Sequence, residues 1–253
     1  MKSPSQAYDM DLPCHGGPVS LVAHQLPFTV KVVRTEHELM RVCRVRAIAY
    51  ERHMPGFGVK LSEPEVHDRA PGNVILIAED KQTGEAVGTM RMHTNMHQRL
   101  PLQAAASLPL YMQRQLLVEV CRFSVKPGYS NGEVRQALFK ALYLYCHASQ
   151  AQYMVVAARR PLNEIYKSLG FKALHGGEEQ WVPLSYAGGR PHSLLSFNVP
   201  LAEQLWQDID HPLYDFMRRT YHPDIQVLAG MNSIWNHARP VAEQTVDQVH
   251  VAF

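Results

Sequence analysis

A nearly continuous apolar run extends from Leu116 to Val125, and two charged residues interrupt it, Glu119 and Arg122. A short apolar run rich in β-branched residues and followed by a turn predicts a buried strand. Ionised side chains are rarely buried unless they are paired, so these two charges mark a candidate site. A Glu–Arg ion pair that only fixes the register of the strand is the structural alternative.

A long amphipathic helix follows this strand after a Pro/Gly turn. Ser130 and Glu133 have the S-x-x-E spacing of a capping box, which predicts that the helix starts here. A strand that leads into a helix N-terminus makes an anion site, because free backbone N–H groups point there. The apolar positions form one stripe at helical spacing, namely Val134, Ala137, Leu138, Ala141, Leu142 and Tyr145.

The same patterns predict the remaining elements. Residues 28–33 form a first strand, and Thr35 with Glu38 opens a helix to about His53. The runs at 73–80 and 86–93 predict a hairpin. The apolar insertion at 94–115 predicts a short helix that caps a cleft. Further strands are expected at 152–157, 180–184 and 193–199, and helices at 161–169, 201–209 and 212–220.

These elements divide the chain into three parts. We expect a tail or strap over residues 1–27, one mixed α/β domain over 28–200, and a C-terminal helical extension and tail over 201–253.

Two more arginines lie among apolar neighbours. Arg46 lies in the middle of the helix face formed by Leu39, Cys43 and Tyr50, and Arg91 lies within the strand at 86–93. An arginine directed inward needs an anionic partner, unless its guanidinium reaches past the edge of the core.

Composition places the chain among globular proteins, with 46% hydrophobic and 19% charged residues. A formal net charge of +2 gives no support for nucleic-acid binding. The sequence has no hydrophobic N-terminal region and no run of 18 apolar residues, so we expect a cytoplasmic protein without a transmembrane segment. We expect no metal site, because CxxC and HExxH are absent; His93 and His97 are interpreted as surface or loop residues.

The predicted order of elements resembles the GNAT acyltransferase fold, a mixed and mostly antiparallel sheet with helices on both faces. YKSLGF, from Tyr166 to Phe171, is similar to the Y-x-x-x-G-F that closes the fourth helix of that fold. VEVCRFSV, with Glu119, Arg122 and Phe123, resembles the E-x-x-R-F strand of the LuxI-type acyl-homoserine lactone synthases and the FeeM-type N-acyl amino acid synthases.

Three further segments carry the resemblance to these synthases. GTMRMH contains Arg91 and resembles their G-x-x-R strand, and Arg46 with Tyr50 resembles the R…F/Y pair of their first helix. The loop EPEVHDRAPG is similar to their acidic loop, with Asp68 as the matching acid and Glu65 in place of a second one. No tryptophan follows the first helix, where lactone synthases usually have one, so the resemblance favours the N-acyl amino acid synthases.

The resemblance implies transfer of a long-chain fatty acyl group from a thioester to the amine of an amino acid. CoA-using members bind the pyrophosphate in a Q/R-x-x-G-x-G/A loop, whereas this chain has Tyr129-Ser130-Asn131-Gly132-Glu133-Val134. This departure favours the single phosphate of acyl-phosphopantetheine on acyl carrier protein, with acyl-CoA as the alternative. No tightly bound cofactor is expected.

A protonated amine cannot attack a thioester, so a base must accept its proton, and Glu119 is the candidate. Burial would raise the pKa of Glu119 and Arg122 would lower it. Tyr166 would protonate the departing thiolate, as the resemblance implies, or would only pack in the core. Because Glu119 and Arg122 are three residues apart, they reach one side of a strand only if a β-bulge separates them.

The remaining candidates concern substrate binding. Arg46, Arg91 and Arg122 offer guanidinium groups for the carboxylate of the acceptor. Tyr50 and Phe123 complete the substrate-binding set, and Asp68 would hold the ammonium group of the acceptor or brace an arginine. Methionines at 90, 92, 96 and 112 are candidates for an acyl tunnel or are ordinary core residues.

Two other functions remain open at this stage. One is a CoA-dependent N-acetyltransferase of the same fold. The other is a non-catalytic sensor of acyl ligands, or a module that binds the carrier protein.

Overall fold

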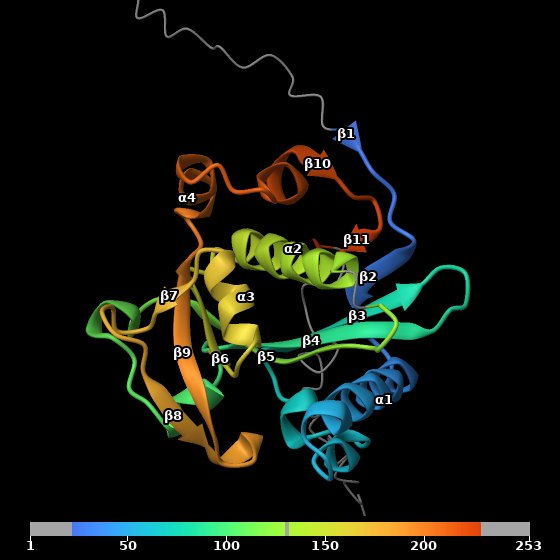
Figure 1. Cartoon of the computed structure of the whole chain (residues 1–253), viewed down its shortest axis with the longest axis horizontal. Helices are drawn as coiled ribbons and strands as arrows, with labels where there is room; N and C mark the ends of the chain where they lie inside the picture. The colour runs from blue at the N-terminus through green and yellow to red at the C-terminus, as the bar shows by residue number, and fades with distance from the viewer. Residues whose placement is uncertain (1–21, 130–131, 229–253) are drawn as a thin grey trace, which may run out of the picture.

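A mixed sheet forms the centre of the molecule (Figure 1). The computed structural model describes residues 22–129 and 132–228. Within these residues the main sheet has the order β11-β2-β3-β4-β5-β6-β9-β7, and β8 pairs with β9. The strands are β2 (Phe28–Val32), β3 (Asn73–Asp80), β4 (Ala86–Thr94), β5 (Leu117–Val125), β6 (Tyr153–Ala158), β7 (Lys172–Ala173), β8 (Trp181–Leu184), β9 (Arg190–Asn198) and β11 (Ile225–Gln226).

Most neighbouring strands run antiparallel, while β5 with β6 and β11 with β2 are parallel. Helices cover both faces, with α1 (Glu36–His53) on one side and α2 (Glu133–Ala148) and α3 (Leu162–Ser168) on the other (Figure 1). Alternation along β3 explains this arrangement, because Ile75 packs against α1 and Leu76 packs against α2. The predicted fold class is therefore confirmed.

The start of α1 agrees with its sequence signal. The hydroxyl of Thr35 accepts a hydrogen bond from the backbone N–H of Glu38 at 3.2 Å, and the Glu38 carboxylate accepts one from the N–H of Thr35 at 3.1 Å. This reciprocal pair is the predicted capping box. It fixes the direction in which α1 crosses the sheet, and with it the position of Arg46.

The capping box predicted for α2, Ser130 with Glu133, stays a prediction. The helix begins at Glu133, and its N-cap is Gly132 in a left-handed conformation with φ of 99°, without a side-chain cap. Ser130 itself lies outside the described residues. Glycine adopts positive φ without steric cost, so the chain turns into the helix two residues later than the S-x-x-E spacing indicates.

β5 contains the expected bulge. On β4, Met90 alone lies opposite two residues of β5, Arg122 and Phe123, and Arg122 has a left-handed φ of 51°. An extra residue in one strand turns the following side chain toward the other face. The Arg122 side chain thus reaches the same side of the sheet as Glu119.

β5 and β6 then separate. Their parallel ladder runs from Leu117–Tyr153 to Val120–Val156, while both strands continue beyond it. The sheet therefore opens between the second half of β5 and the end of β6.

The insertion at 94–115 contains two short 3₁₀ helices, Pro101–Ala104 and Leu110–Met112. They pack a second apolar cluster against the sheet, in which Leu102 and Met112 contact the cluster of Leu117 and Val155.

The described C-terminal part returns to the N-terminal strands. α4 (Ala202–Asp208) is followed by a π-helix (Asp215–Arg219), where a longer helix was expected. β10 (Thr220–Tyr221) then pairs with β1 (Val22–Ala23), and β11 adds to the edge of the main sheet. Among the described residues, no helix is long and apolar enough to cross a membrane.

Candidate active site

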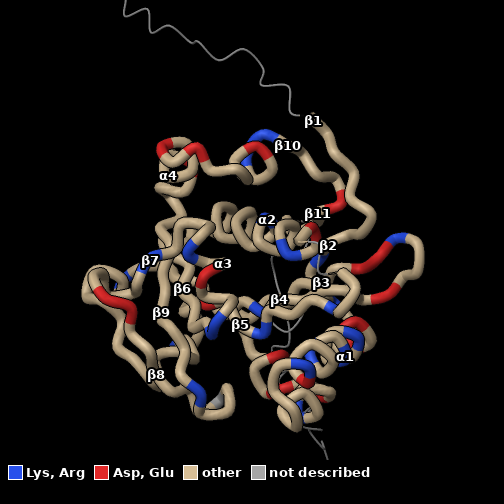
Figure 2. Tube along the Cα trace, in the orientation of Figure 1, with Lys and Arg blue, Asp and Glu red and all other residues tan. Residues whose placement is uncertain are grey.

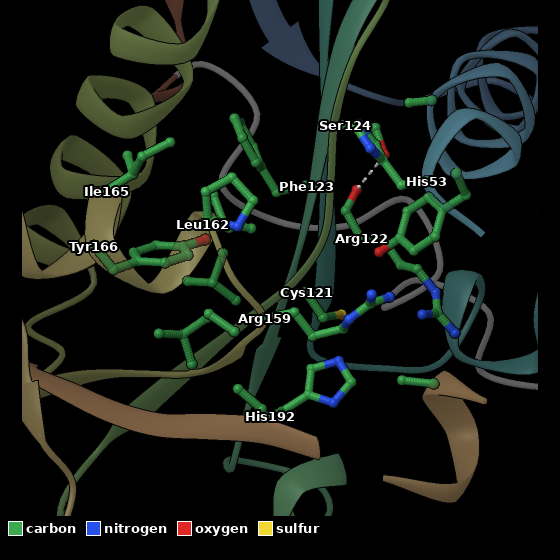
Figure 3. A pocket seen from close by; sticks show the side chains of 18 of the residues that line it. His53, Cys121, Arg122, Phe123, Ser124, Arg159, Leu162, Ile165, Tyr166 and His192 are labelled. Carbon is green, nitrogen blue, oxygen red and sulfur yellow. Dashed lines mark hydrogen bonds between the residues drawn. The ribbon is translucent and has the colours of Figure 1, made fainter. Parts of the chain in front are cut away.

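A cavity of about 440 Å³ lies where β5 and β6 separate (Figure 3). Residues of α1, β5, β6, α3 and β9 line it, so segments far apart in the sequence meet there. Five of the eight candidate residues belong to its wall, namely Tyr50, Glu119, Arg122, Phe123 and Tyr166.

Behind this wall, arginines and acids alternate in a connected chain (Figure 2 shows blue and red residues together between β5 and α1). Nη1 of Arg46 donates to both carboxylate oxygens of Asp68, at 2.8 and 2.9 Å. Nη1 of Arg91 donates to Asp68 at 2.8 Å and to Glu65 at 3.0 Å. Nε and Nη2 of Arg122 donate to the two carboxylate oxygens of Glu65, at 2.7 and 2.5 Å. Three cations thus share two anions.

The two acids of this chain are held ionised. Burial alone would raise the pKa of Asp68, but Arg46 and Arg91 outweigh it and hold that pKa below its usual value. Burial likewise opposes ionisation of Glu65, and the hydrogen bond from Arg122 together with the charge of Arg91 holds its pKa low. The loop at 65–68 is itself tied, because the N–H of Glu65 donates to Asp68 at 2.7 Å.

The structure separates the three arginines by position. Arg46 and Asp68 are fully buried and do not line the cavity, and neither does Arg91. Arg122 does line it, and its guanidinium lies 5.8 Å from the ring centroids of both Tyr50 and Phe57. Of the alternatives for Asp68, the contacts correspond to bracing an arginine.

Glu119 lies on β5 with 1% of its surface exposed. Its Oε2 accepts a hydrogen bond at 2.9 Å from the backbone N–H of Leu102, in the first 3₁₀ helix of the insertion. On the neighbouring strand it lies opposite His93. The insertion therefore positions the carboxylate in the cavity wall.

Tyr166 reaches the cavity from α3, and its ring points toward β5 (Figure 3). Phe171 packs edge-on against it at 5.0 Å and Phe139 lies tilted at 5.3 Å. Burial raises the pKa of the Tyr166 phenol, so its hydroxyl keeps its proton and acts as a donor.

A family model described as N-acyl amino acid synthase FeeM matches residues 41–183. The chain belongs to the FeeM N-acyl amino acid synthase family. The predicted resemblance is thereby confirmed, and the chain is an acyltransferase. No curated protein is similar enough in sequence to match it.

Solved structures of two synthases have the same fold. FeeM, an N-acyl amino acid synthase from uncultured soil microbes, is 17% identical, with a TM-score of 0.54 over 75% of this chain and 98% of its own. BjaI, a CoA-dependent acyl-homoserine lactone synthase, is 14% identical, with a TM-score of 0.51 over 77% of this chain and 93% of its own.

Two residues of this FeeM-family site were not among the predicted candidates. The Sγ of Cys121 lies 3.1 Å from Nε2 of His93, and Nε of Arg91 donates to that same nitrogen at 3.0 Å. Burial and the charge of Arg91 lower the pKa of His93 to about 3, so the imidazole is neutral. His93 lies in β4 with 1% exposure, so its interpretation as a surface or loop residue is wrong. The i, i+2 spacing of Glu119 and Cys121 could have indicated their shared face.

The expected methionine tunnel is absent from this cavity. Met90 and Met92 belong to the core under α2, Met112 belongs to the cluster beneath the insertion, and Met96 is 66% exposed. The apolar part of the cavity wall includes other residues, among them Phe123, Val156, Leu162, Ile165 and Leu184. The alternation of residues along a strand did not reveal which apolar residues line the cavity, because it leaves open which face of the sheet borders a cavity.

Proposed function

We propose that the protein transfers a long-chain fatty acyl group from the thioester of acyl carrier protein to the amine of an amino acid. One observation carries this proposal: Glu119, on β5, and Tyr166, on α3, line the same cavity at the gap between β5 and β6. A thioester in that gap would lie between a carboxylate and a neutral phenol.

Each group has a distinct role in the reaction. The Glu119 carboxylate accepts a proton from the acceptor ammonium, directly or through water, and the free amine attacks the thioester carbon. The carbon–nitrogen bond forms, the attached nitrogen releases its second proton to water, and the carbon–sulfur bond breaks. The hydroxyl of Tyr166 gives its proton to the departing thiolate and then recovers one from solvent.

The oxyanion of the tetrahedral intermediate needs fixed donors. Beyond Val120, β5 no longer forms a ladder with β6, so backbone groups on that edge are available to the gap. The bulge at Arg122 sets the direction of these groups. We assign oxyanion stabilisation to this part of β5.

The three arginines mainly hold the cavity wall in place. Arg46 and Arg91 brace the acidic loop, and Arg122 borders the cavity while bound to Glu65. Tyr50 and Phe123 form the flat sides against which substrate packs.

The end of the cavity near α2 bears on the choice of acyl donor. Gly132 and Arg135, at the start of α2, line this end, and a helix N-terminus favours one phosphate group. Glu133 places a negative charge in the same turn, which disfavours a pyrophosphate. This balance supports phosphopantetheine on a carrier protein.

Acyl-CoA remains a second candidate donor for one specific reason. Arg135, in the first turn of α2, lines the cavity, and its positive charge favours a second phosphate group. Direct comparison of acyl carrier protein and acyl-CoA with the same acyl chain decides between them.

Mass spectrometry of lipid extracts tests the reaction. Cells that overproduce the protein are expected to accumulate new N-acyl amino acids, which would identify the acceptor and the chain length together. Glu119→Gln keeps the size of the side chain and is expected to abolish them, while Glu85→Gln, at an exposed surface ion pair, keeps them. Equal extracts from the wild type and Glu119→Gln would reject the proposal.

A further inference from the structure

The cavity wall on the β6 side contains an arginine that differs from the three described above. Arg159 directly follows β6 and lines the cavity. Among the residues that the structure describes, no carboxylate pairs with it, whereas Arg46, Arg91 and Arg122 all bind Glu65 or Asp68. Figure 3 shows the Arg159 side chain directed into the cavity, toward the side of β5.

The electrostatic surroundings of Arg159 favour an incoming anion. Burial, followed by the nearby charge of Arg190, lowers the pKa of the Arg159 guanidinium. A partly buried cation beside a second cation is stabilised when an anionic ligand neutralises it. A guanidinium binds a carboxylate through two parallel hydrogen bonds, which suits one small anion.

His192 supplies an acceptor beside this arginine. It lies on β9 with 7% exposure and lines the cavity. Its Nδ1 lies 2.7 Å from the backbone oxygen of Arg190. A carbonyl oxygen can only accept, so Nδ1 carries the hydrogen and Nε2 keeps its lone pair. Burial lowers the pKa of His192, and the charges of Arg159 and Arg122 act in the same direction.

The positions of the two side chains are complementary. In Figure 3 the imidazole of His192 points up into the cavity below the guanidinium of Arg159. The guanidinium of Arg159, a hydrogen-bond donor, and the neutral imidazole of His192, an acceptor, therefore face the same part of the cavity. The gap between β5 and β6 borders that part. An α-amino acid carries a carboxylate and an amine one carbon apart, which matches this pair of groups.

We infer that Arg159 and His192 form the acceptor site, in which Arg159 binds the carboxylate of a free amino acid and Nε2 of His192 accepts a hydrogen from its amine. This inference rests on the proposed function and assigns the two residues that recognise its amino acid acceptor. Arg159 is a cation that no carboxylate of the described residues already neutralises. The amine is thereby held between His192 and the thioester.

The test compares two acceptor mixtures under otherwise identical conditions. Purified protein receives a long-chain acyl carrier protein thioester with either the twenty standard amino acids or the amines formed by their decarboxylation. Products are quantified by mass spectrometry. The wild type is expected to acylate the amino acids and to discriminate against the amines.

Variants at Arg159 then test whether this residue causes the preference for amino acids over amines. Arg159→Gln is expected to raise the KM for the preferred amino acid about 10- to 100-fold, as expected for loss of hydrogen bonds between charged groups. The KM for the acyl donor and the rate with amines stay unchanged. Arg159→Lys keeps the charge and retains part of the discrimination. Arg44→Gln removes the same charge from the exposed side of α1 and behaves as wild type.

Two results would overturn the inference alone: an unchanged KM in a folded Arg159→Gln protein, or a wild type that acylates the amines as readily as the amino acids. A wild type that forms no product from either mixture would reject the proposed function, and this inference with it.

Discussion

Arg46 and Asp68 form an ion pair in which neither side chain is exposed to solvent. The two residues lie 22 positions apart, on α1 and in the loop before β3, and one nitrogen of the arginine contacts both carboxylate oxygens. Two other guanidinium nitrogens of Arg46, Nε and Nη2, have no hydrogen-bond partner among the described residues. Asp68 is therefore the group that allows Arg46 to be buried.

We predict that Asp68→Asn lowers the free energy of unfolding by about 3–5 kcal/mol, because it leaves a buried charge without a counter-ion. Glu65→Gln is expected to cost less, since the side chain of Glu65 is 23% exposed. Urea denaturation of the two variants measures both values. Equal losses would contradict the claim that burial sets the cost.

The same pair predicts a dependence on pH. The pKa of Asp68 is lowered in the folded state, so its carboxylate stabilises the fold above the unfolded pKa of about 4. That contribution is lost as the pH falls through the lower folded pKa. The difference in unfolding free energy between wild type and Asp68→Asn should shrink below about pH 4. A constant difference would show that the charge of Asp68 is not responsible.

The bulge at Arg122 gives a second prediction. Glycine and alanine both remove the guanidinium, but only glycine adopts a φ of 51° without strain. Arg122→Gly should therefore be about 1 kcal/mol more stable than Arg122→Ala. At Val120, in the regular part of β5, the order should be reversed. Thermal or urea unfolding of the four proteins checks this, and the same order at both positions would contradict the bulge.

Sequence reasoning located the central strand, the bulge within it and the capped start of α1, because each leaves a local signal. Glu119 and Arg122 interrupt an apolar run, and Thr35 has its partner three residues away. The alternating chain of acids and arginines could not be assigned in this way, since its partners come from α1, the loop at 65–68, β4 and β5.

Other parts of the site leave no local signal at all. The left-handed conformation of Gly132 at the start of α2 is one example, because a positive φ is a property of the turn as a whole. Arg159 and His192 reach the cavity only because β6 pairs with β9 next to the gap. The wall opposite β5 therefore required the folded arrangement.

Tyr166 provides a third prediction. Tyr166→Phe keeps the ring that packs against Phe139 and Phe171 but removes the hydroxyl proton. We expect kcat to fall at least about 10-fold while stability and the KM for the acceptor stay unchanged, since only proton transfer to the thiolate is lost. An unchanged kcat would leave Tyr166 with packing alone.

Cys121 provides a fourth prediction. Cys43 and Cys146 are buried, and burial raises the pKa of the Cys43 thiol to about 11, whereas Cys121 lines the cavity. Among these three described cysteines, iodoacetamide should therefore modify Cys121 first and stop acyl transfer. Peptide mass spectrometry with and without saturating acyl donor checks this, and protection by the donor is expected. Equal labelling of all three thiols would contradict the greater accessibility of Cys121. Labelling of Cys121 that the donor does not reduce would contradict the position of the donor.

The central claim is tested most directly with purified protein, an acyl-phosphopantetheinyl carrier protein and the twenty standard amino acids. We predict formation of an N-acyl amino acid by the wild type, and a decrease of at least about 100-fold in the rate for Glu119→Gln, because Glu119 is the base assigned to the amine proton. No product, or equal rates for the two proteins, would contradict the account.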